Sequence, residues 1–458
     1  MARSDRSSSD SAEQRSKRHA RDYNVGLPAR RAAVGLLRAV LKDRMTLDAA
    51  LGNSRAAREM IALPQRDKAL ARAISSTTLR RLGQIDAVLS QFLDKKLPKR
   101  AGPLQEILRA ATCQLLFLDT PSHAAIDLAV TQCKQDRNAR HFDKLANAVL
   151  RRVDQKGRDI AASQDAARLN TPDWLWNRWE ADYGMDTAQR IGEAHLREAA
   201  LDLSVKQDPE GWAKILDGAV LKTGTVRVPH SGAIEKLEGF SDGQWWVQDA
   251  AAALPASLFG DVKGKRIADL CAAPGGKTAQ LAQSGAEVTA VDSSKKRLER
   301  LRENMSRLEL RVETVCADAG EWRGEGDFDG VLLDAPCTGT GTLRRHPDIA
   351  YLKNARDLEE LSLLQARLLR HSVTLLRPGG TLMYCTCSLE KEEGKDQIFD
   401  LLRDVKDLRV EPIRSDEIGG YDSWVTGEGF LRTLPFHLAE KDEKLAGIDG
   451  FFVARLVA

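Results

Sequence analysis

From Lys263 to the end of the chain, short apolar runs alternate with longer segments of helical periodicity. The runs predicted to be strands are Arg266–Leu270, Glu287–Val291, Val312–Cys316, Phe328–Leu333 and Thr381–Cys385. The predicted helices are Thr278–Ser284, Ser294–Leu308 and Leu358–Leu376, the last followed by Arg377-Pro378-Gly379-Gly380. This alternation predicts an α/β domain with a mostly parallel sheet and helices on both faces. Ligands of such sheets bind beyond the carboxyl ends of the strands, so the loops there should carry the chemistry.

The chain before Lys263 divides into stretches of different composition. Residues 1–27 are rich in Ser, Arg and Asp, which predicts a disordered basic tail. Residues 28–155 carry amphipathic helical patterns, so an all-α domain is expected there. Its apolar faces are Ala32, Val34, Leu36, Leu37, Val40 and Leu41, and Leu104, Ile107, Leu108, Ala111, Leu115 and Leu116. Residues 156–262 are interpreted as a small α/β connecting module that touches the substrate, and residues 263–458 as the α/β domain.

The connecting module combines short β-like runs with a cluster of tryptophans. The runs are Leu201–Val205 and Thr225–Val228, and the tryptophans include Trp176, Trp179, Trp245 and Trp246. Aromatic residues at this density form either a core or a platform on which bases stack. We interpret the cluster as core.

Charge is distributed unevenly along the chain. Residues 1–160 hold 31 Lys/Arg and 17 Asp/Glu, an excess of 14 positive charges. Because the whole chain carries +3, the remainder carries −11. A basic first third suggests a nucleic-acid-binding module, although a solvated helical surface would give the same composition. With no apolar run long enough to span a bilayer and no secretory signal, we expect a cytoplasmic protein without a membrane partner.

The chain has seven cysteines, namely Cys113, Cys133, Cys271, Cys316, Cys337, Cys385 and Cys387. The odd number in a large chain argues against a disulfide framework. No CxxC occurs and no histidine lies near the CxC at 385–387, so no metal site is expected. Cys113, Cys133, Cys316 and, with less support, Cys385 are interpreted as small buried apolar residues.

The first α/β loop, DLCAAPGGKT at 269–278, lacks the spacing of a P-loop or of G-x-G-x-x-G. Its small residues let backbone approach a ligand, and the helix that follows offers free N–H groups to a carboxylate. Asp292 ends the second strand, where it is placed to bind ribose hydroxyls, and Asp318 follows the third strand, where it would bind an adenine amino group. Taken alone, the glycine loop could be an ordinary tight turn between strand and helix, and Asp292 could be a helix cap. Together they favour a nucleoside-containing cofactor, and the form of the first loop argues against NAD.

Two further loops at this edge carry cysteine beside a carboxylate. Asp334-Ala335-Pro336-Cys337 ends one strand, and Cys385-Thr386-Cys387-Ser388 ends the next. Cytosine C5 is a poor nucleophile, but addition of a thiolate at C6 makes C5 an enamine carbon that accepts a methyl group. Cysteine suits this chemistry because its thiolate both attacks and leaves well. Asp334 would bond N3 or the amino group of the base.

These motifs resemble the NOL1/NOP2/Sun family of RNA cytosine-5 methyltransferases. The matching segments are DLCAAPGGKT at 269–278, DAPCTGTG at 334–341, CTCS at 385–388, Gln248-Asp249 before the cofactor loop and DGFFVA at 449–454. Residues 30–154 resemble a NusB-type RNA-binding domain, with 145–151 as its closing helix. This combination is that of the bacterial Sun/Fmu type, which forms 5-methylcytidine in 16S ribosomal RNA. The resemblance implies a Rossmann-like class I methyltransferase fold, S-adenosylmethionine as cofactor and RNA as partner.

The resemblance also implies roles for individual residues. Cys387 would be the nucleophile and Cys337 would assist resolution of the covalent adduct; DNA cytosine methyltransferases use a Pro-Cys cysteine, which makes Cys337 the alternative nucleophile. Lys277 would approach the target base as well as the cofactor. The cofactor would be held by Cys271, Ala272, Ala273, Pro274, Gly275, Gly276, Lys277, Asp292, Asp318 and Asp334.

One segment departs from the family pattern. Leu203-Ser204-Val205-Lys206 replaces the usual Leu-Arg-Val-Asn, so the RNA contact of that arginine is not assigned here. Arg344 and Arg345 would either compensate or form an exposed basic turn. Transfer RNA, another ribosomal cytosine and a non-catalytic role in ribosome assembly remain alternatives to catalysis on 16S RNA. We expect a monomer.

Overall fold

The computed structural model describes residues 26–98, 100–229, 232–324, 326–439, 442 and 444–458. The tail expected at 1–27 lies outside these residues up to position 25. The chain forms two compact units, Met1–Thr171 and Pro172–Ala458. Among the described residues, no helix is long and apolar enough to cross a membrane.

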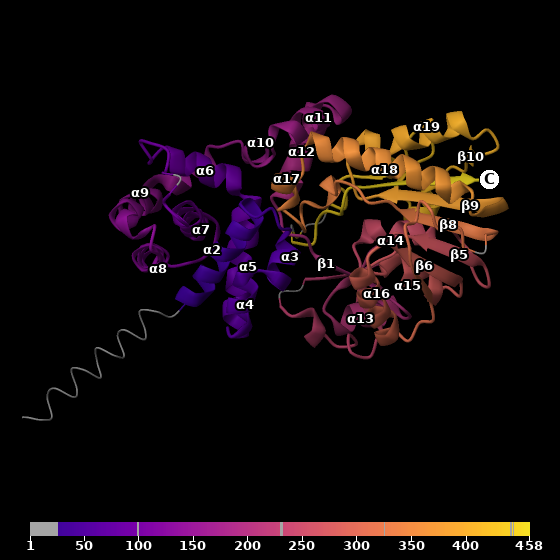
Figure 1. Cartoon of the computed structure of the whole chain (residues 1–458), viewed down its shortest axis with the longest axis horizontal. Helices are drawn as coiled ribbons and strands as arrows, with labels where there is room; N and C mark the ends of the chain where they lie inside the picture. Colours follow the sequence, from indigo (N-terminus) through magenta and orange to yellow (C-terminus); the bar gives the residue numbers. More distant parts are fainter. Residues whose placement is uncertain (1–25, 99, 230–231, 325, 440–441, 443) are drawn as a thin grey trace, which may run out of the picture. The chain divides into compact units, whose positions relative to one another are not determined.

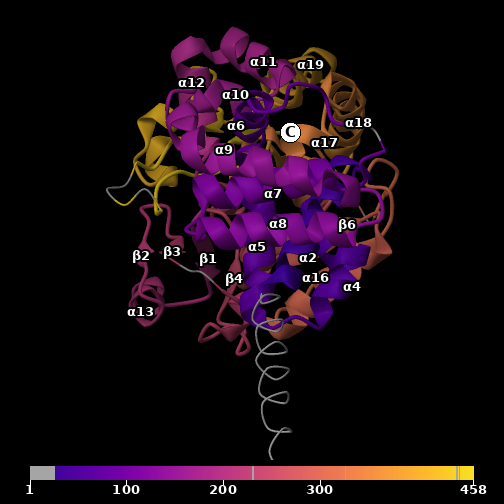
Figure 2. The ribbon, with the colours of Figure 1, turned by 90° about the vertical axis from the view of Figure 1, so that its left-hand side faces the viewer.

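The first unit is helical, as expected. Its helices are α2 (Leu27–Leu41), α3 (Leu47–Asn53), α4 (Arg55–Ile61), α5 (Gln65–Arg80), α6 (Leu82–Ser90), α7 (Leu104–Phe117), α8 (Ser122–Gln135), α9 (Asp143–Ala162) and α10 (Ala166–Asn170). Figure 2 looks onto this unit, with α7 and α8 side by side. Ten of the twelve residues of its predicted apolar faces are buried, and the exceptions, Leu41 and Leu116, are partly exposed.

The first compact unit continues beyond residue 155, where the NusB-like domain was expected to end. Helix α9 continues to Ala162, with Val153 and Gly157 buried. Helix α10 then packs on α6, where Asn170 accepts the backbone N–H of Gln84 at 3.2 Å and donates to its side chain at 3.0 Å. The division therefore falls after Thr171.

The connecting module begins with α11 (Asp173–Tyr183) and α12 (Met185–His195). A small antiparallel sheet follows in the order β2-β3-β1-β4, with β1 at Leu201–Val205, β2 at Ala219–Val220, β3 at Val226–Val228 and β4 at Trp245–Val247. Helix α13 (Pro209–Ile215) packs on this sheet. Trp176, Trp179, Trp245 and Trp246 are buried, which confirms that the aromatic cluster is core.

The large sheet has the order β10-β12-β9-β8-β5-β6-β7, with β11 pairing β12. Its strands are β5 (Arg266–Leu270), β6 (Glu287–Asp292), β7 (Glu313–Cys316), β8 (Phe328–Asp334), β9 (Leu376–Thr386), β10 (Arg409–Val410), β11 (Leu431–Thr433) and β12 (Phe451–Val457). Strands β5 to β9 are parallel to their neighbours, whereas β12 runs antiparallel to β9, β10 and β11. The mostly parallel sheet and its closing strand thus match the expectation.

Helices cover both faces of the large sheet (Figure 1). Helices α18 (Ala355–Val373) and α19 (Lys395–Asp404) share a core with Val331 and Leu333 of β8. Helices α14 (Ala250–Ser257) and α15 (Gly276–Gln283) share the opposite core with Leu332, and α16 (Lys295–Arg307) packs beside α15. Alternate β8 residues thus face opposite layers, as the period of a strand requires.

Helix α18 ends earlier than expected. It stops at Val373, and the Leu376–Gly380 segment belongs to β9. Phe328 pairs with Leu376 and Gly330 with Thr381, with an irregularity in β8 between these pairs. Leu376, which the helical periodicity assigned to the helix, therefore belongs to the strand because it pairs with β8.

Candidate active site

The parallel strands end together at one edge of the sheet. Asp334 lies beside Cys385 in the β8–β9 pair, and Asp292 lies beside Cys316 in the β6–β7 pair. Because parallel neighbours keep their carboxyl ends level, the loops that leave them open on the same side. The structure thus brings the cofactor loops and the cysteine loops to one edge.

The loop after β5 makes a tight turn into α15. Gly275 has φ +101°, and a Cβ there would lie 2.9 Å from Cγ of Leu301, so glycine is required on both counts. Cys271 has φ +60°, an uncommon conformation for a residue with a side chain and one that clusters at functional sites. Helix α15 begins at Gly276, and its first N–H groups have no intrahelical acceptor.

The two aspartates predicted to bind the cofactor lie in different surroundings. Asp292 is 1% exposed, accepts the N–H of Ala273 at 3.2 Å and is ion-paired with Arg297 at 3.3 Å. It therefore ties the cofactor loop to the end of β6. Asp318 is exposed after β7, where hydrogen bonds from Arg367 lower its pKa most. Any ligand of Asp318 would share the carboxylate with this guanidinium.

Lys277, in the first turn of α15, reaches the end of β8. Its Nζ lies 2.7 Å from Oδ2 of Asp334 and 5.1 Å from the ring centre of Phe451. Burial alone would lower the pKa of the ammonium group, but the carboxylate of Asp334 and neighbouring acidic groups raise it above its ordinary value. Cys385 donates its Sγ–H to Oδ1 of Asp334 at 3.5 Å. Asp334 is therefore fixed at the site by a donor on each oxygen.

The Sγ atoms of Cys337 and Cys387 lie 3.4 Å apart, although 50 positions separate the residues in the chain. We call these two residues the cysteine pair; both are half-buried. The N–H of Gly341 donates to the carbonyl of Cys387 at 3.0 Å, which fastens one loop to the other. The hydrogen bond with Cys387 raises the pKa of Cys337 most, and burial raises it further. This arrangement fits a pair in which one sulfur carries the charge and the other the proton.

Sequence reasoning missed Glu393, whose carboxylate bonds the residue that follows Cys337. It belongs to the short 3-10 helix η4 (Lys391–Glu393), and its side chain is fully buried. Both oxygens accept the N–H of Thr338, at 2.9 and 3.1 Å. The only signal in the sequence is the charged run Glu390-Lys391-Glu392-Glu393 after Ser388, a pattern typical of an exposed turn.

The two basic residues after the Pro-Cys loop differ in exposure: Arg344 is buried, whereas Arg345 is exposed. Arg344 is 1% exposed and donates to the carbonyl of Ala446 at 2.8 Å, so the expectation that it contacts RNA is wrong. Arg345 is ion-paired with Asp449 and keeps an exposed side. Ser204, at the position of the family's usual arginine, is buried and donates to Gln248, 2.8 Å away.

The remaining cysteines divide into two groups. Cys113, Cys133 and Cys385 are fully buried, as expected. Cys316 is exposed, so its interpretation as a buried apolar residue is wrong. The reason is its place at the end of β7, which is the outer strand of the sheet and has β6 as its one sheet neighbour.

A group of carboxylates in the second unit has ligand atoms close enough to hold a metal ion, namely Asp182, Glu390 and Glu392. Their charges are already paired, because Arg178 bonds Glu390 and Glu392 and Lys391 bonds Asp182 at 2.8 Å. These ion pairs account for the cluster without a cation.

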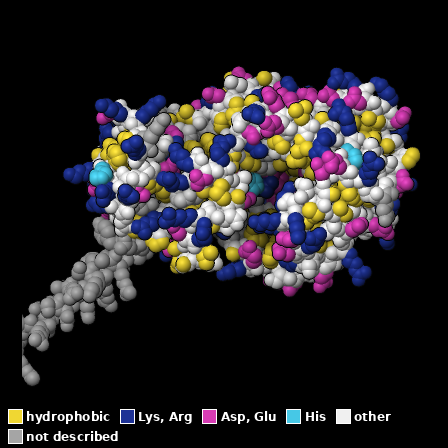
Figure 3. All heavy atoms as spheres, in the orientation of Figure 1, with side chains coloured by type: hydrophobic (Ala, Val, Ile, Leu, Met, Phe, Trp, Pro, Cys, Tyr) yellow, Lys and Arg dark blue, Asp and Glu magenta, His cyan; other side chains and the backbone are white. Residues whose placement is uncertain are grey.

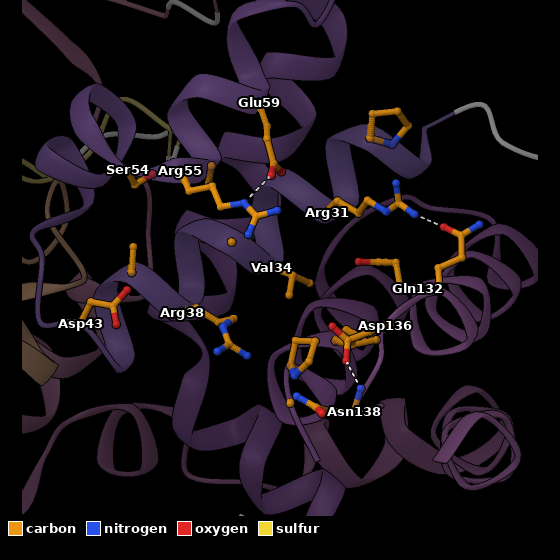
Figure 4. Close-up of a pocket in the computed structure, with 18 residues that line it drawn as sticks. Arg31, Val34, Arg38, Asp43, Ser54, Arg55, Glu59, Gln132, Asp136 and Asn138 are labelled. Atoms are coloured by element: carbon orange, nitrogen blue, oxygen red, sulfur yellow. Dashed lines mark hydrogen bonds and ion pairs between the residues drawn. The ribbon is translucent and has the colours of Figure 1, made fainter. Parts of the chain in front are cut away.

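In the first unit, arginines line a hollow between α2, α4 and the segment after α8, of about 780 Å³ (Figure 4). Arg31 is hydrogen-bonded to Gln135 and Arg55 to Glu59. Arg38 extends into the hollow, and among the described residues its side chain has no hydrogen-bond or ion-pair partner. Figure 3 shows further Lys and Arg side chains over the visible face of this unit.

Comparison with known proteins agrees with this geometry. A sequence model of the 16S rRNA methyltransferase RsmB/F family matches residues 257–457, and a NusB family model matches residues 27–155. The ribosomal RNA small subunit methyltransferase B of Vibrio cholerae is 36% identical over 365 residues, which cover 75% of this chain and 83% of that protein. The chain belongs to the RsmB/F family. Membership confirms the family predicted from the motifs and the NusB-like fold of the helical unit.

Solved structures support the fold of the RsmB/F family member described here. The crystal structure of PH0851 superposes with a TM-score of 0.74 at 22% identity and covers 94% of this chain and 98% of that one. A methyltransferase homolog protein from Pyrococcus horikoshii gives a TM-score of 0.50 at 28% identity, covering 61% of this chain and 93% of that one.

As a member of this family, the protein is an S-adenosylmethionine-dependent methyltransferase of ribosomal RNA. The hydrogen-bonding groups at the edge of the sheet suit the groups of that cofactor. The first N–H groups of α15 suit a carboxylate, and Asp292 and Asp318 suit hydroxyl and amino donors. When bound, the cofactor supplies an electrophilic methyl group.

Proposed function

We propose that the protein methylates C5 of a cytosine in 16S ribosomal RNA through a covalent bond between Sγ of Cys387 and C6 of the base. The observation that carries this proposal is the 3.4 Å separation of the cysteine pair. Asp334, held by Lys277, lies at the same sheet edge. A protein that only binds RNA would need none of these groups.

The proposed reaction needs the Cys387 thiolate, the methyl group of the cofactor and a base. The Cys387 thiolate adds to C6, and the electron pair displaced toward C5 takes the methyl group while the cofactor leaves as S-adenosylhomocysteine. A base then removes the C5 proton, and the S–C6 bond breaks to restore the ring and the thiolate. Cysteine suits both ends of this sequence, because it is a good nucleophile and a good leaving group.

The remaining groups assist the same steps. Asp334 accepts a hydrogen bond from the amino group of cytosine, or donates one to N3 as the protonated acid, and so orients C6 toward Cys387. Lys277 approaches the base from the cofactor loop, and its ion pair with Asp334 holds both side chains in place. Cys337, the proton-bearing partner, assists release of the adduct.

The choice of 16S RNA rests on the relatives and on the first unit. The relatives that cover most of this chain are named as small-subunit methyltransferases. The hollow of Arg31, Arg38 and Arg55 offers guanidinium groups to backbone phosphates, which supply most sequence-independent affinity.

Methyl transfer from labelled cofactor to RNA tests the proposal. We expect Cys387→Ala to lose transfer and keep RNA binding, whereas Cys316→Ala, which removes an exposed thiol outside the pair, keeps both. Full activity of Cys387→Ala would overturn the assigned nucleophile. Mapping 5-methylcytidine in cells with and without the protein tests the substrate: loss at one 16S position is expected, and loss confined to transfer RNA would overturn the choice of 16S RNA.

A further inference from the structure

The buried carboxylate of Glu393 holds the loop of Cys337. Its oxygens accept the backbone N–H of Thr338, the residue after Cys337, and the Thr338 hydroxyl at 2.5 Å. Gln365 of α18 donates to the same carboxylate at 2.9 Å and to the carbonyl of Pro336, also at 2.9 Å. Glu393 thus holds the backbone after Cys337 directly and the backbone before it through Gln365.

Glu393 also holds the strand end that carries Cys387. Its backbone carbonyl accepts the hydroxyls of Tyr384 at 2.9 Å and Thr386 at 3.2 Å. On the other side of Cys387, the hydroxyl of Ser388 lies 3.3 Å from that of Thr338. The two cysteine loops therefore meet at one residue.

The charge of this carboxylate is not neutralised by a cation. Within the described ranges, no Lys or Arg is ion-paired with Glu393, and the groups bonded to its carboxylate are neutral donors. Burial raises its pKa, while the hydrogen bonds from Ser388, Thr338 and Gln365 oppose that rise. A set made of donors fits the ionised form, which is an acceptor only.

The ionisable groups around the cysteine pair include both acidic and basic side chains. After the hydrogen bond with Cys387 and burial, the Cys387 sulfur and the carboxylates of Glu393 and Asp334 raise the pKa of Cys337 further. Tyr384, whose own pKa is raised by burial, also faces Cys337. Cys387 instead acts on Arg345: burial lowers the pKa of that guanidinium, Asp449 raises it most, and the charge of Cys387 adds to the rise.

We propose that Glu393 is a positioning residue for the cysteine pair: its hydrogen bonds fix the two loops in register and give the two sulfurs different surroundings. This inference rests on the proposed function, in which the two cysteines have separate roles. It explains how two thiols 3.4 Å apart are kept chemically distinct.

Thiol alkylation without RNA tests the inference separately from catalysis. The full-length protein is treated with iodoacetamide between pH 6 and pH 9, and peptide mass spectrometry gives the rate at each cysteine, with exposed Cys316 as reference. We expect Cys387 to react faster than Cys337 in the natural protein. Glu393→Gln should narrow that ratio by about tenfold, because one pKa unit is a tenfold change in thiolate fraction. The pH profile of methyl transfer should shift in parallel.

Glu390→Gln is the matched control, since Glu390 is a buried glutamate of the same segment that bonds Trp179 and Arg178 instead. It should leave the alkylation ratio unchanged. Glu393→Asp keeps the charge and should retain more of the ratio than Glu393→Gln. An unchanged ratio and pH profile in folded Glu393→Gln would overturn the inference. If that variant does not fold, Thr338→Val removes one donor to the carboxylate; unchanged transfer and ratio in that folded variant would overturn it as well.

These outcomes are distinct from failure of the proposed function. If Cys387→Ala kept full methyl transfer, the assigned nucleophile would fail, while the alkylation ratio would still report whether Glu393 distinguishes the two thiols.

Discussion

Arg38 and Arg55 of the first unit differ in surroundings from Arg227 of the second. In the first unit, Arg55 pairs with Glu59 along an exposed helix, and Arg38 extends into an open hollow. In the second unit, Arg227 is 1% exposed, binds Asp202 through two nitrogens and donates to the carbonyl of Gly447. Arg227 holds the connecting sheet and the C-terminal segment together, whereas Arg38 remains available to a polyanion. Substitution of Arg227 should therefore act on stability, and substitution of Arg38 on RNA affinity.

The largest effect on activity is expected at Asp334. Asp334→Asn removes the ion pair with Lys277 and the carboxylate that orients the base, so methyl transfer should fall about 10²- to 10⁴-fold. Transfer from labelled cofactor at saturating RNA measures this. Asp318→Asn, which alters an exposed carboxylate, is the matched comparison and should affect the Kd of the cofactor more than the rate. Equal loss of rate in both variants would contradict the separate roles.

Arginine truncation in the two units tests the comparison directly. Arg227→Ala leaves Asp202 buried without its partner and should lower the free energy of unfolding by about 3–5 kcal/mol. Arg55→Ala breaks an exposed pair and should cost less than about 0.5 kcal/mol. Denaturant unfolding followed by the fluorescence of the second unit's tryptophans gives the cost of Arg227→Ala. Unfolding followed by circular dichroism of the helices gives the cost of Arg55→Ala. Similar losses of unfolding free energy in the two variants would show that burial does not distinguish Arg227 from Arg55.

The buried Glu390 predicts a dependence of stability on pH. Burial raises its pKa to about 7, against hydrogen bonds from Trp179 and Arg178 that lower it. A carboxyl group whose pKa is higher in the folded state stabilises that state at low pH, and this stabilisation is lost as pH rises from about 4.5 to 7. Glu390→Gln should therefore remove at most about 3 kcal/mol of pH-dependent change over that window. A difference in unfolding free energy between natural protein and variant that stays constant with pH would contradict the raised pKa.

The smallest expected effect lies in the first unit. Arg38→Ala should weaken RNA binding uniformly across sequences and reduce the slope of log K against log salt by about 1. Fluorescence anisotropy at several salt concentrations measures this slope, with Arg158→Ala as a control outside the hollow. An unchanged slope would show that the Arg38 side chain in this hollow does not contact RNA phosphates.

The catalytic edge was predictable because its motifs are local. The bounds of β5 and β1 match the sequence prediction, and β6, β7 and β8 differ by one residue at an end. The apolar runs and glycine turns specify where each strand ends, and the parallel sheet then places Asp292, Asp334 and Cys387 at one edge. No long-range information was needed beyond the rule that parallel strands keep their carboxyl ends level.

What the sequence did not reveal depends on pairing between distant segments. Cys316 resembles the other buried cysteines in pattern, yet it lies at the end of an outer strand and is exposed. Arg344 follows a loop but is covered by the segment near Ala446, about a hundred positions away. Glu393 looks like part of a charged turn until Thr338 and Gln365 enclose it. Burial of a charged side chain requires specific partners, and a single sequence does not show which ones meet.

We propose that Cys387, and not Cys337, attacks the base. Cys337→Ala should slow release of the adduct, so that a covalent protein–RNA species accumulates when the variant is incubated with RNA and cofactor. Nuclease and protease digestion followed by mass spectrometry identifies the modified cysteine. We predict a methylated cytidine on the peptide that contains Cys387 and no such species in the Cys387→Ala variant. An adduct on Cys337 in the Cys387→Ala variant or in the natural protein, with Cys387 unmodified, would contradict the account.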